Sequence, residues 1–405
     1  MVKNFLKLAS GTGVSQVINL VSIVYFANAV GVASFGIYSA LISLGLIFST
    51  FSGFRLELAL QVTNNRYREK HLFSLAYISS TLFYFISLII AVFFYLVFEI
   101  NVSLGFITLS LTSIYVFSLN QIASYLHIND GDFKLLSFFR VVRTLMIVVL
   151  QVFLLNLSKD EVGLLYGYLI GNIVSGVIFN SKKVFNSLVV NINVGYSLKV
   201  LSKYKEFPKF QMPLDFVMMV SHQLPMLFIM TFIGSAQLGV YALATKLLQA
   251  PVSLLGLSLK QVLYHHFGET LNKERINIDA IKLTVVMVLS IALLSPVYYM
   301  VINNIFPLVL DEQWQKSLYA LNILFPMFAV VFCSIPSSVI ATMCSLQDKV
   351  LNVTLITLLI KFLVMLIMWN ILGNFDEFLV VIVLISIVQT MIQMIFTFYK
   401  AGNIK

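Results

Sequence analysis

Residues 31–38 read Gly-Val-Ala-Ser-Phe-Gly-Ile-Tyr, and residues 234–241 read Gly-Ser-Ala-Gln-Leu-Gly-Val-Tyr. The two glycines, one alanine and the tyrosine recur at a constant offset of 203 residues in a chain of 405. Both copies lie between two long apolar segments. A repeat at half the chain length, in the same context, indicates two homologous halves. Duplicated halves in a membrane are typical of transporters, whose substrate site lies between the repeats.

The composition is that of a membrane protein. Hydrophobic residues make up 60% of the chain, charged residues make up 11%, and the mean hydropathy is +0.95. A soluble domain has about 25% charged residues. The net charge of +9 does not indicate nucleic-acid binding, because the cations lie in short loops between apolar segments. Two cysteines and no metal-binding spacing give no reason to expect a metal or another cofactor. The first apolar segment lacks a small-residue cleavage site and is expected to stay as a helix.

A spanning helix needs about 20 apolar residues. Such runs predict an all-α polytopic membrane protein with twelve transmembrane helices in two parallel six-helix lobes around a central cavity. The predicted spans are 10–30, 37–61, 73–97, 103–126, 135–157, 163–181, 212–233, 240–262, 281–303, 318–344, 350–372 and 378–400. The predicted parts are an N-terminal lobe (1–181), an inter-lobe linker (182–211) and a C-terminal lobe (212–405).

The basic residues predict the orientation. If both termini are cytoplasmic, the predicted outer loops contain only Lys159 and Lys316, and the other loop cations face the cytoplasm. This distribution follows the rule that cytoplasmic loops are enriched in lysine and arginine. The linker is cytoplasmic in this orientation, and an amphipathic interfacial stretch is expected around Val189–Leu201.

The segment from Gly234 to Pro251, which includes Lys246, resembles the connection between helices seven and eight of Wzx-type polysaccharide flippases. Ser10-Gly-Thr-Gly-Val-Ser, followed by Gly31-x4-Gly-x-Tyr38, resembles the opening of the same family. The family belongs to the multidrug/oligosaccharidyl-lipid/polysaccharide exporter (MOP) superfamily. The similarity extends over the whole chain in length and helix count, although the related lipid II flippases typically have fourteen spans.

The resemblance implies a V-shaped cavity that passes an undecaprenyl diphosphate-linked oligosaccharide, such as an O-antigen repeat unit, across the bacterial inner membrane. It implies alternating access without enzymatic chemistry. The expected partners are the lipid-linked substrate, membrane lipids, and a polysaccharide polymerase with its chain-length machinery.

Ionisable side chains inside spans are costly, at roughly 2.5–3.5 kcal/mol each, and they tend to be paired or to face a wet cavity. Within the predicted spans, cations outnumber anions six to two: Arg55, Arg140, Arg143, Lys246, Lys260 and Lys361 against Glu57 and Asp215. This excess suits an anionic ligand such as a diphosphate.

Four of these cations are predicted to bind the substrate: Arg55, Arg143, Lys246 and Lys361. Lys361 is the strongest candidate because it lies far from both ends of its helix. An internal pair with Asp215 or Glu57 is the alternative for Lys361, and interfacial snorkelling is the alternative for Arg143.

Glu57, Asp215 and His222 are candidates for ion or proton coupling. Asp215 and His222 lie two turns apart on one helix face and could relay a proton. The alternative for this pair, which we favour slightly, is a hydrogen bond that holds two helices together.

Gly31, Gly36, Gly234 and Gly239 are predicted to form paired gating turns at the outer ends of the helices. Glycine would allow a tight turn and a close approach of two backbones there. A static hairpin is the alternative.

Two other functions remain open. A drug/cation antiporter of the same superfamily would have the same fold, although such proteins usually bind their cations with acidic residues. A membrane polysaccharide polymerase would have a similar composition, but the short outer loops argue against it. No Walker motif indicates direct use of ATP.

Overall fold

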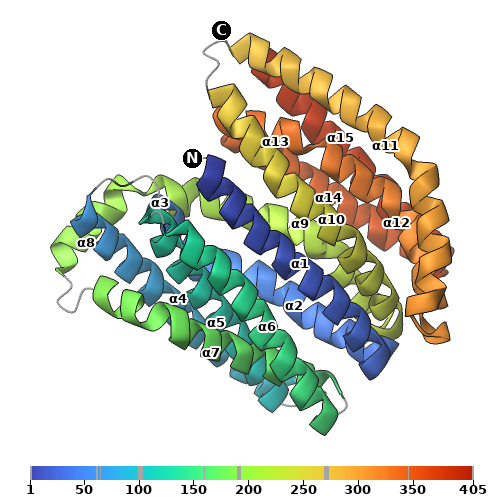
Figure 1. Cartoon of the computed structure of the whole chain (residues 1–405), viewed down its shortest axis with the longest axis horizontal. Coiled ribbons are helices and arrows are strands. Elements are labelled where there is room, and N and C mark those ends of the chain that lie inside the picture. The colour runs from blue at the N-terminus through green and yellow to red at the C-terminus, as the bar shows by residue number, and fades with distance from the viewer. Residues whose placement is uncertain are drawn as a thin grey trace. The chain divides into compact units, whose positions relative to one another are not determined.

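The computed structural model describes residues 2–60, 63, 65–98, 104–130, 132–158, 160–188, 193–268, 273–344 and 346–403. In this part of the chain every regular element is a helix, as the all-α prediction requires (Figure 1). The elements are α1 (Val2–Val30), α2 (Val32–Ser52), α3 (Leu56–Ala59), α4 (Arg66–Phe98), α5 (Leu104–Asn129), α6 (Phe133–Ser158), α7 (Glu161–Ser187), α8 (Val194–Lys203), η2 (Phe207–Gln211), α9 (Met212–Phe232), α10 (Ser235–Gly268), α11 (Lys273–Val309), η3 (Glu312–Trp314), α12 (Gln315–Cys333), α13 (Ile335–Met343), α14 (Gln347–Leu372) and α15 (Phe375–Gly402).

The prediction of twelve spans is confirmed, because twelve helical stretches in the described residues are long and apolar enough to cross a membrane. Two predicted helices are interrupted. The helix predicted over 37–61 ends at Ser52, and the one predicted over 318–344 divides at Ser334 into α12 and α13. Pro336, which lacks a backbone N–H donor, lies at the start of α13 and accounts for the second interruption.

The helices form two compact units. Unit 1 contains Met1–Ser22 and Ile37–Gln223, and unit 2 contains Ile23–Gly36 and Leu224–Lys405. The chain therefore passes from one unit to the other within α1, near the start of α2 and within α9. The lobe boundaries predicted from the sequence, at 181 and 211, remain a prediction.

The core of unit 1 holds the short helix α3 in place. Leu56, Ala59 and Leu60 are buried against Leu72 and Phe73 of α4, together with residues of α5 and α8. The whole of α3 is therefore anchored from several sides, which fixes the direction of the polar side chains next to it.

Helices α6 and α7 make the closest helix pair of unit 1. A Cβ atom at Gly171 of α7 would lie 2.6 Å from the Cα of Ile147 in α6, so only glycine fits there. Small residues of this kind allow membrane helices to approach closely.

The segment 182–211, predicted as a linker, is largely helical in its described part. α7 continues to Ser187, α8 covers Val194–Lys203, and η2 is a turn of π-helix directly before α9. α8 packs on α4. The predicted amphipathic stretch 189–201 lies outside the described residues at 189–192, and the rest of it falls mainly in α8.

In unit 2, α12 and α15 pack together, with α10 beside α12 and α14 beside α15 (Figure 1). Trp314, at the end of η3, is fully buried, and its ring meets that of Phe35 edge to face with centroids 5.6 Å apart. The first turn of α2 is thus fixed to the start of α12 inside this unit.

Candidate functional site: a buried arginine between two carboxylates

The backbone reverses direction directly after α2. Phe54 and Arg55 have φ angles of 49° and 56°, in the left-handed region that non-glycine residues seldom adopt. Such a conformation costs on the order of 1–3 kcal/mol per residue and is found mainly where function requires it. The prediction of a continuous helix through Arg55 and Glu57 is therefore wrong: the span ends at Ser52, and both residues lie in the connection that follows it.

This turn aims Arg55 at two carboxylates. Its Nη1 donates to Oε1 of Glu57 at 3.4 Å, and its Nε lies 2.9 Å from Oδ2 of Asp215. The side chains are largely buried, with exposed fractions of 14% for Arg55, 5% for Glu57 and 22% for Asp215. Arg55 is therefore shared by two carboxylates. Glu57 is close to it in the sequence, and Asp215 lies near the C-terminal end of unit 1.

The carboxylate of Asp215 has a second partner from the π-helical turn. Nε2 of Gln211 donates to Oδ1 of Asp215 at 3.0 Å. π-helical turns are rare and are often found at functional sites. Gln211 was not among the residues selected from the sequence, and only the nearby Pro208 and Pro213 marked this irregularity.

Glu57 is the most buried member of the group. Its Oε2 has no hydrogen-bond partner among the described residues, and a Cβ atom at Gly53 would lie 2.6 Å from this oxygen. Burial raises the pKa of the Glu57 carboxyl, and the charge of Arg55 opposes this effect. A proton can therefore be added at Oε2 of Glu57 without breaking a hydrogen bond.

Tyr125 and Arg140 are two further polar side chains near Arg55, Glu57 and Asp215. Tyr125 of α5 feels the charges of Arg55, Glu57, Asp215 and Arg140. The Nη1 of Arg140 in α6 donates to Oγ1 of Thr12 in α1 at 2.7 Å. Sequence reasoning gave these two residues no part in the site, because their proximity depends on how α1, α5 and α6 pack.

Arg143 is held elsewhere in unit 1. Its Nε and Nη2 both donate to Oδ1 of Asn172, at 2.9 and 2.6 Å, and its guanidinium lies 5.1 Å from the ring centroid of Phe117. The backbone carbonyl of Asn172 accepts from Asn120 at 2.8 Å. These contacts tie α6, α7 and α5 together.

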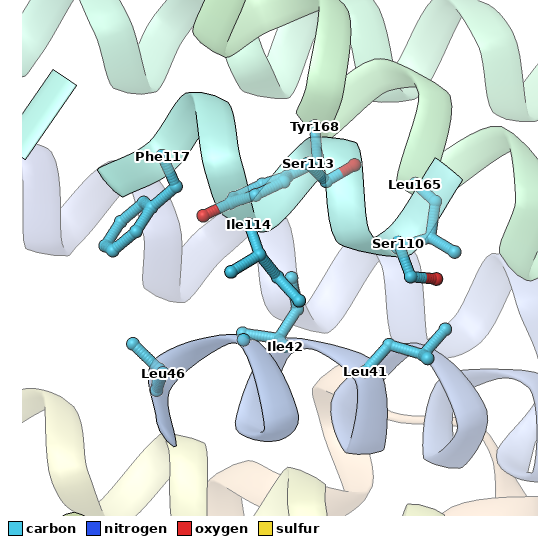
Figure 2. A pocket seen from close by; sticks show the side chains of 10 residues that line it. Leu41, Ile42, Leu46, Ser110, Ser113, Ile114, Phe117, Leu165 and Tyr168 are labelled. Atoms are coloured by element: carbon cyan, nitrogen blue, oxygen red, sulfur yellow. The ribbon is translucent and has the colours of Figure 1, made fainter. Parts of the chain in front are cut away.

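A small cavity of about 20 Å³ lies in the same region of unit 1 (Figure 2). Phe117 and Tyr168 line it together with Ser110 and Ser113, opposite apolar side chains of α2. It has room for a single water molecule. An oligosaccharide headgroup does not fit in it.

Unit 2 contains the other two predicted ligand residues. The Nζ of Lys246 in α10 lies 4.8 Å from the ring centroid of Phe35. Lys361 is only 4% exposed and lies on the face of α14 that also buries Thr354 and Thr357. Gln389 of α15 donates to Thr357 at 3.3 Å, so this face is a polar seam between the two helices.

The predicted relay joins Asp215 and His222, which both lie on α9. Asp215 is engaged by Arg55 and Gln211, and His222 is exposed two turns further along α9. A role for His222 in coupling stays a prediction.

The four glycines lie at two equivalent turns within unit 2. Gly31 and Gly234 have φ angles of 78° and 136°, and they join α1 to α2 and α9 to α10. A Cβ atom at Gly36 would collide with the carbonyl of Ser235, and one at Gly239 with the carbonyl of Val32. The close backbone approach is present, and its use as a gate stays a prediction.

In the described residues, no group of three or more histidine, cysteine, aspartate or glutamate side chains could hold a metal ion. The polar groups can instead bind an anion, exchange a proton, or do both.

Solved structures of transporters share this fold. A ligand complex of the MATE multidrug transporter DinF-BH matches with a TM-score of 0.65 at 15% identity, over 99% of this chain and 95% of that one. The MATE transporter VcmN of Vibrio cholerae matches with a TM-score of 0.61 at 15% identity, over 98% and 96% of the two chains. At this level of identity the likeness shows the fold alone.

A third structure is a MOP superfamily transporter from Pyrococcus furiosus, for which a reverse polarity of the binding pocket suggests a different function. It matches with a TM-score of 0.55 at 13% identity, over 99% of this chain and 96% of that one. The curated protein sequences contain no significant match to this chain.

The family model described as "Polysaccharide biosynthesis protein" matches residues 1–271, about two thirds of the chain. With the twelve spans and the fold shared with solved transporters, this match confirms the resemblance seen in the sequence: the chain belongs to the polysaccharide biosynthesis protein family and is a multi-pass membrane protein.

Proposed function

We propose that this protein is a flippase that carries undecaprenyl diphosphate-linked oligosaccharide units from the cytoplasmic to the outer leaflet of the bacterial inner membrane. Both termini are cytoplasmic in this proposal. Arg55, Glu57 and Asp215, which we call the Arg55 group, lie at the cytoplasmic end of their helices. The family match supports a role in polysaccharide biosynthesis.

One observation supports an anionic cargo above all. Apart from the first two turns and the last turn of each span, the described membrane spans of unit 2 carry only two charged side chains, Lys246 and Lys361, and both are cations. Lys260, which was predicted to lie within a span, is also in α10 but lies beyond the end of that span at Gly256. Lysine at such a depth is costly in a membrane unless it is paired, serves a ligand or faces an aqueous path. Two cations at this depth suit an anionic ligand such as a diphosphate.

A drug/cation antiporter is the second candidate. The observation that favours it is the pair of carboxylates Glu57 and Asp215, which are the kind of group that would bind a cation. In this chain, however, both carboxylates contact Arg55, so their charge is already partly neutralised. For the Pyrococcus furiosus transporter, a reverse polarity of the binding pocket suggests a different function, which is a precedent for functional diversity on this fold.

The experiment uses the full-length protein in liposomes that contain undecaprenyl diphosphate bearing a fluorescently labelled sugar. Dithionite added outside destroys the fluorescence of outer-leaflet lipid, so the decay reports flipping. We expect Lys361→Met to slow flipping about tenfold, because one contact to a charged group is worth roughly 1.5–3 kcal/mol. Lys349→Met, at an exposed lysine of the same helix, is the matched control and keeps the wild-type rate.

Two results would contradict the proposal. One is unaltered flipping by Lys361→Met. The other is export of a cationic dye by the wild-type protein without any flipping of the labelled lipid, which would establish the antiporter instead.

A further inference from the structure

The Arg55 group contains an internal conflict. Arg55 is the only guanidinium that contacts Glu57 and Asp215 in the described residues. A phosphate that takes two parallel donors of Arg55 competes with at least one of these carboxylates, because each such pair of donors includes Nε or Nη1. Like charges only a few ångströms apart repel each other strongly when they are largely shielded from water. A diphosphate next to two ionised carboxylates is therefore strongly disfavoured.

The interactions of the two carboxylates with Arg55 are weak in geometry. Nε of Arg55 is close to Asp215, yet it makes no well-aligned hydrogen bond, and the contact of Nη1 with Glu57 is long at 3.4 Å. Asp215 keeps 22% of its side chain exposed, so a ligand can reach the group from that side. Arginine can offer a phosphate two parallel donors, which neither carboxylate uses here.

A proton resolves the conflict. Oε2 of Glu57 accepts no hydrogen bond in the described structure, so protonation at this oxygen breaks none. It also removes one of the two negative charges around Arg55. The other titratable groups around Glu57 are Asp215 of α9 and Tyr125 of α5, and Arg140 of α6 acts electrostatically on Tyr125.

We propose that Arg55 is an exchange site, at which a diphosphate headgroup displaces the carboxylates as Glu57 takes up a proton. This proposal rests on the proposed function and goes beyond it, because it makes Glu57 a determinant of both ligand affinity and proton coupling. Arg55 binds the phosphate and Glu57 carries the proton. Asp215 contacts Arg55 in the ligand-free protein and is displaced when the ligand binds. Export of the headgroup then reverses both steps, and the proton leaves when the carboxylates return to Arg55.

The sign of the pH dependence follows from this scheme. Burial already raises the pKa of the Glu57 carboxyl, and a bound anion raises it further. The ligand-bound state therefore holds more protons than the free state, and affinity increases as pH falls. Between the pKa of Glu57 in the free protein and its pKa in the complex, one linked proton changes the affinity by about tenfold per pH unit.

The test is isothermal titration calorimetry of the full-length protein in detergent, with farnesyl diphosphate as the probe. Measurements in two buffers of different ionisation enthalpy give the number of protons taken up. We expect wild-type protein to take up about one more proton than Glu57→Gln, which keeps the shape of the side chain and cannot ionise. Proton uptake by Glu57→Gln measures the change in protonation of the diphosphate probe itself. This value is subtracted from the proton uptake of the wild type.

Further variants separate the roles. Asp215→Asn should bind the probe more tightly than wild type and should still take up the proton, because only the competitor is removed. Arg55→Lys should bind at least tenfold more weakly, because lysine cannot make the bidentate contact. Glu377→Gln, at an exposed carboxylate in the first turn of α15, is the control and behaves as wild type.

Inorganic pyrophosphate is titrated in parallel to separate a lipid-linked headgroup from a free anion. Tighter binding of farnesyl diphosphate supports the lipid-linked source, and equal binding overturns that part. Equal proton uptake by wild type and Glu57→Gln overturns the exchange site and leaves the proposed function standing. Absence of binding for both probes contradicts the exchange site and the proposed function together.

Discussion

Gly36 lies directly against the backbone carbonyl of Ser235, and the same relationship recurs between Gly239 and Val32. The offset of 203 residues relates Val32 to Ser235 and Gly36 to Gly239. The repeat seen in the sequence is thus a reciprocal contact inside unit 2, in which the first turns of α2 and α10 meet through their glycines. Each copy of the motif supplies the glycine that the other copy requires.

Gly36→Ala and Gly239→Ala should both destabilise the protein by about 1–3 kcal/mol, since the added methyl group meets a backbone carbonyl that has no room to move. Unfolding in mixed detergent micelles measures the change. Gly105→Ala, at a glycine with nothing within 4 Å of the added atom, is the control and should leave stability unchanged. Tolerance of alanine at both positions would mean that the two turns are not in contact.

Arg55→Met should lower the free energy of unfolding by about 2 kcal/mol, because it leaves two largely buried carboxylates without their cation. Adding Glu57→Gln to this variant should restore more than half of the loss, because one of the two uncompensated charges is then absent. A double-mutant cycle on unfolding measures the coupling. Additive effects of the two substitutions would show that Arg55 and Glu57 do not interact.

The features that could be predicted from the sequence are those set by local rules. Apolar runs of about 20 residues gave the twelve spans, and the repeated glycines gave the equivalent turns. The rest depends on packing. Arg55 and Asp215 are 160 positions apart in the sequence, so nothing local pairs them. The turn at Phe54 and Arg55 was missed because the apolar character continues through Leu60 and conceals the end of the helix.

A second ion-pair group should respond to pH in a defined direction. The Nζ of Lys183 lies 2.7 Å from Oδ2 of Asp130 and 2.9 Å from Oδ2 of Asp132, and the hydrogen bond from Lys183 lowers the pKa of Asp132. A carboxyl whose pKa is lower in the folded state stabilises it above the unfolded value of about 3.9, and this contribution is lost as pH falls through the lowered pKa.

Lys183→Met should therefore weaken the start of α6 at pH 7 and have little effect once Asp132 is protonated. The measurement is the hydrogen-exchange protection of the Leu136 amide, which donates to the carbonyl of Asp132 at 3.0 Å. The difference between wild type and variant should shrink from pH 7 towards the acid limit. A difference that is constant with pH would contradict a role for the Asp132 charge.

Arg143 and Arg55 should respond in opposite ways to replacement by lysine. Arg143 makes two hydrogen bonds to one oxygen of Asn172, whereas Arg55 makes loose contacts with two carboxylates. Lysine cannot reproduce the two-donor geometry at Asn172, so Arg143→Lys should lower stability by about 1–2 kcal/mol and leave the affinity for farnesyl diphosphate unchanged. Arg55→Lys keeps a cation beside both carboxylates and should change stability little, but it should weaken farnesyl diphosphate binding. Unfolding and calorimetry on the same two preparations test both statements. If Arg143→Lys also weakens binding by tenfold or more, Arg143 contributes to the anion site, as the sequence pattern predicted. The hydrogen bonds from Arg143 to Asn172 would then belong to the ligand-free state of the protein.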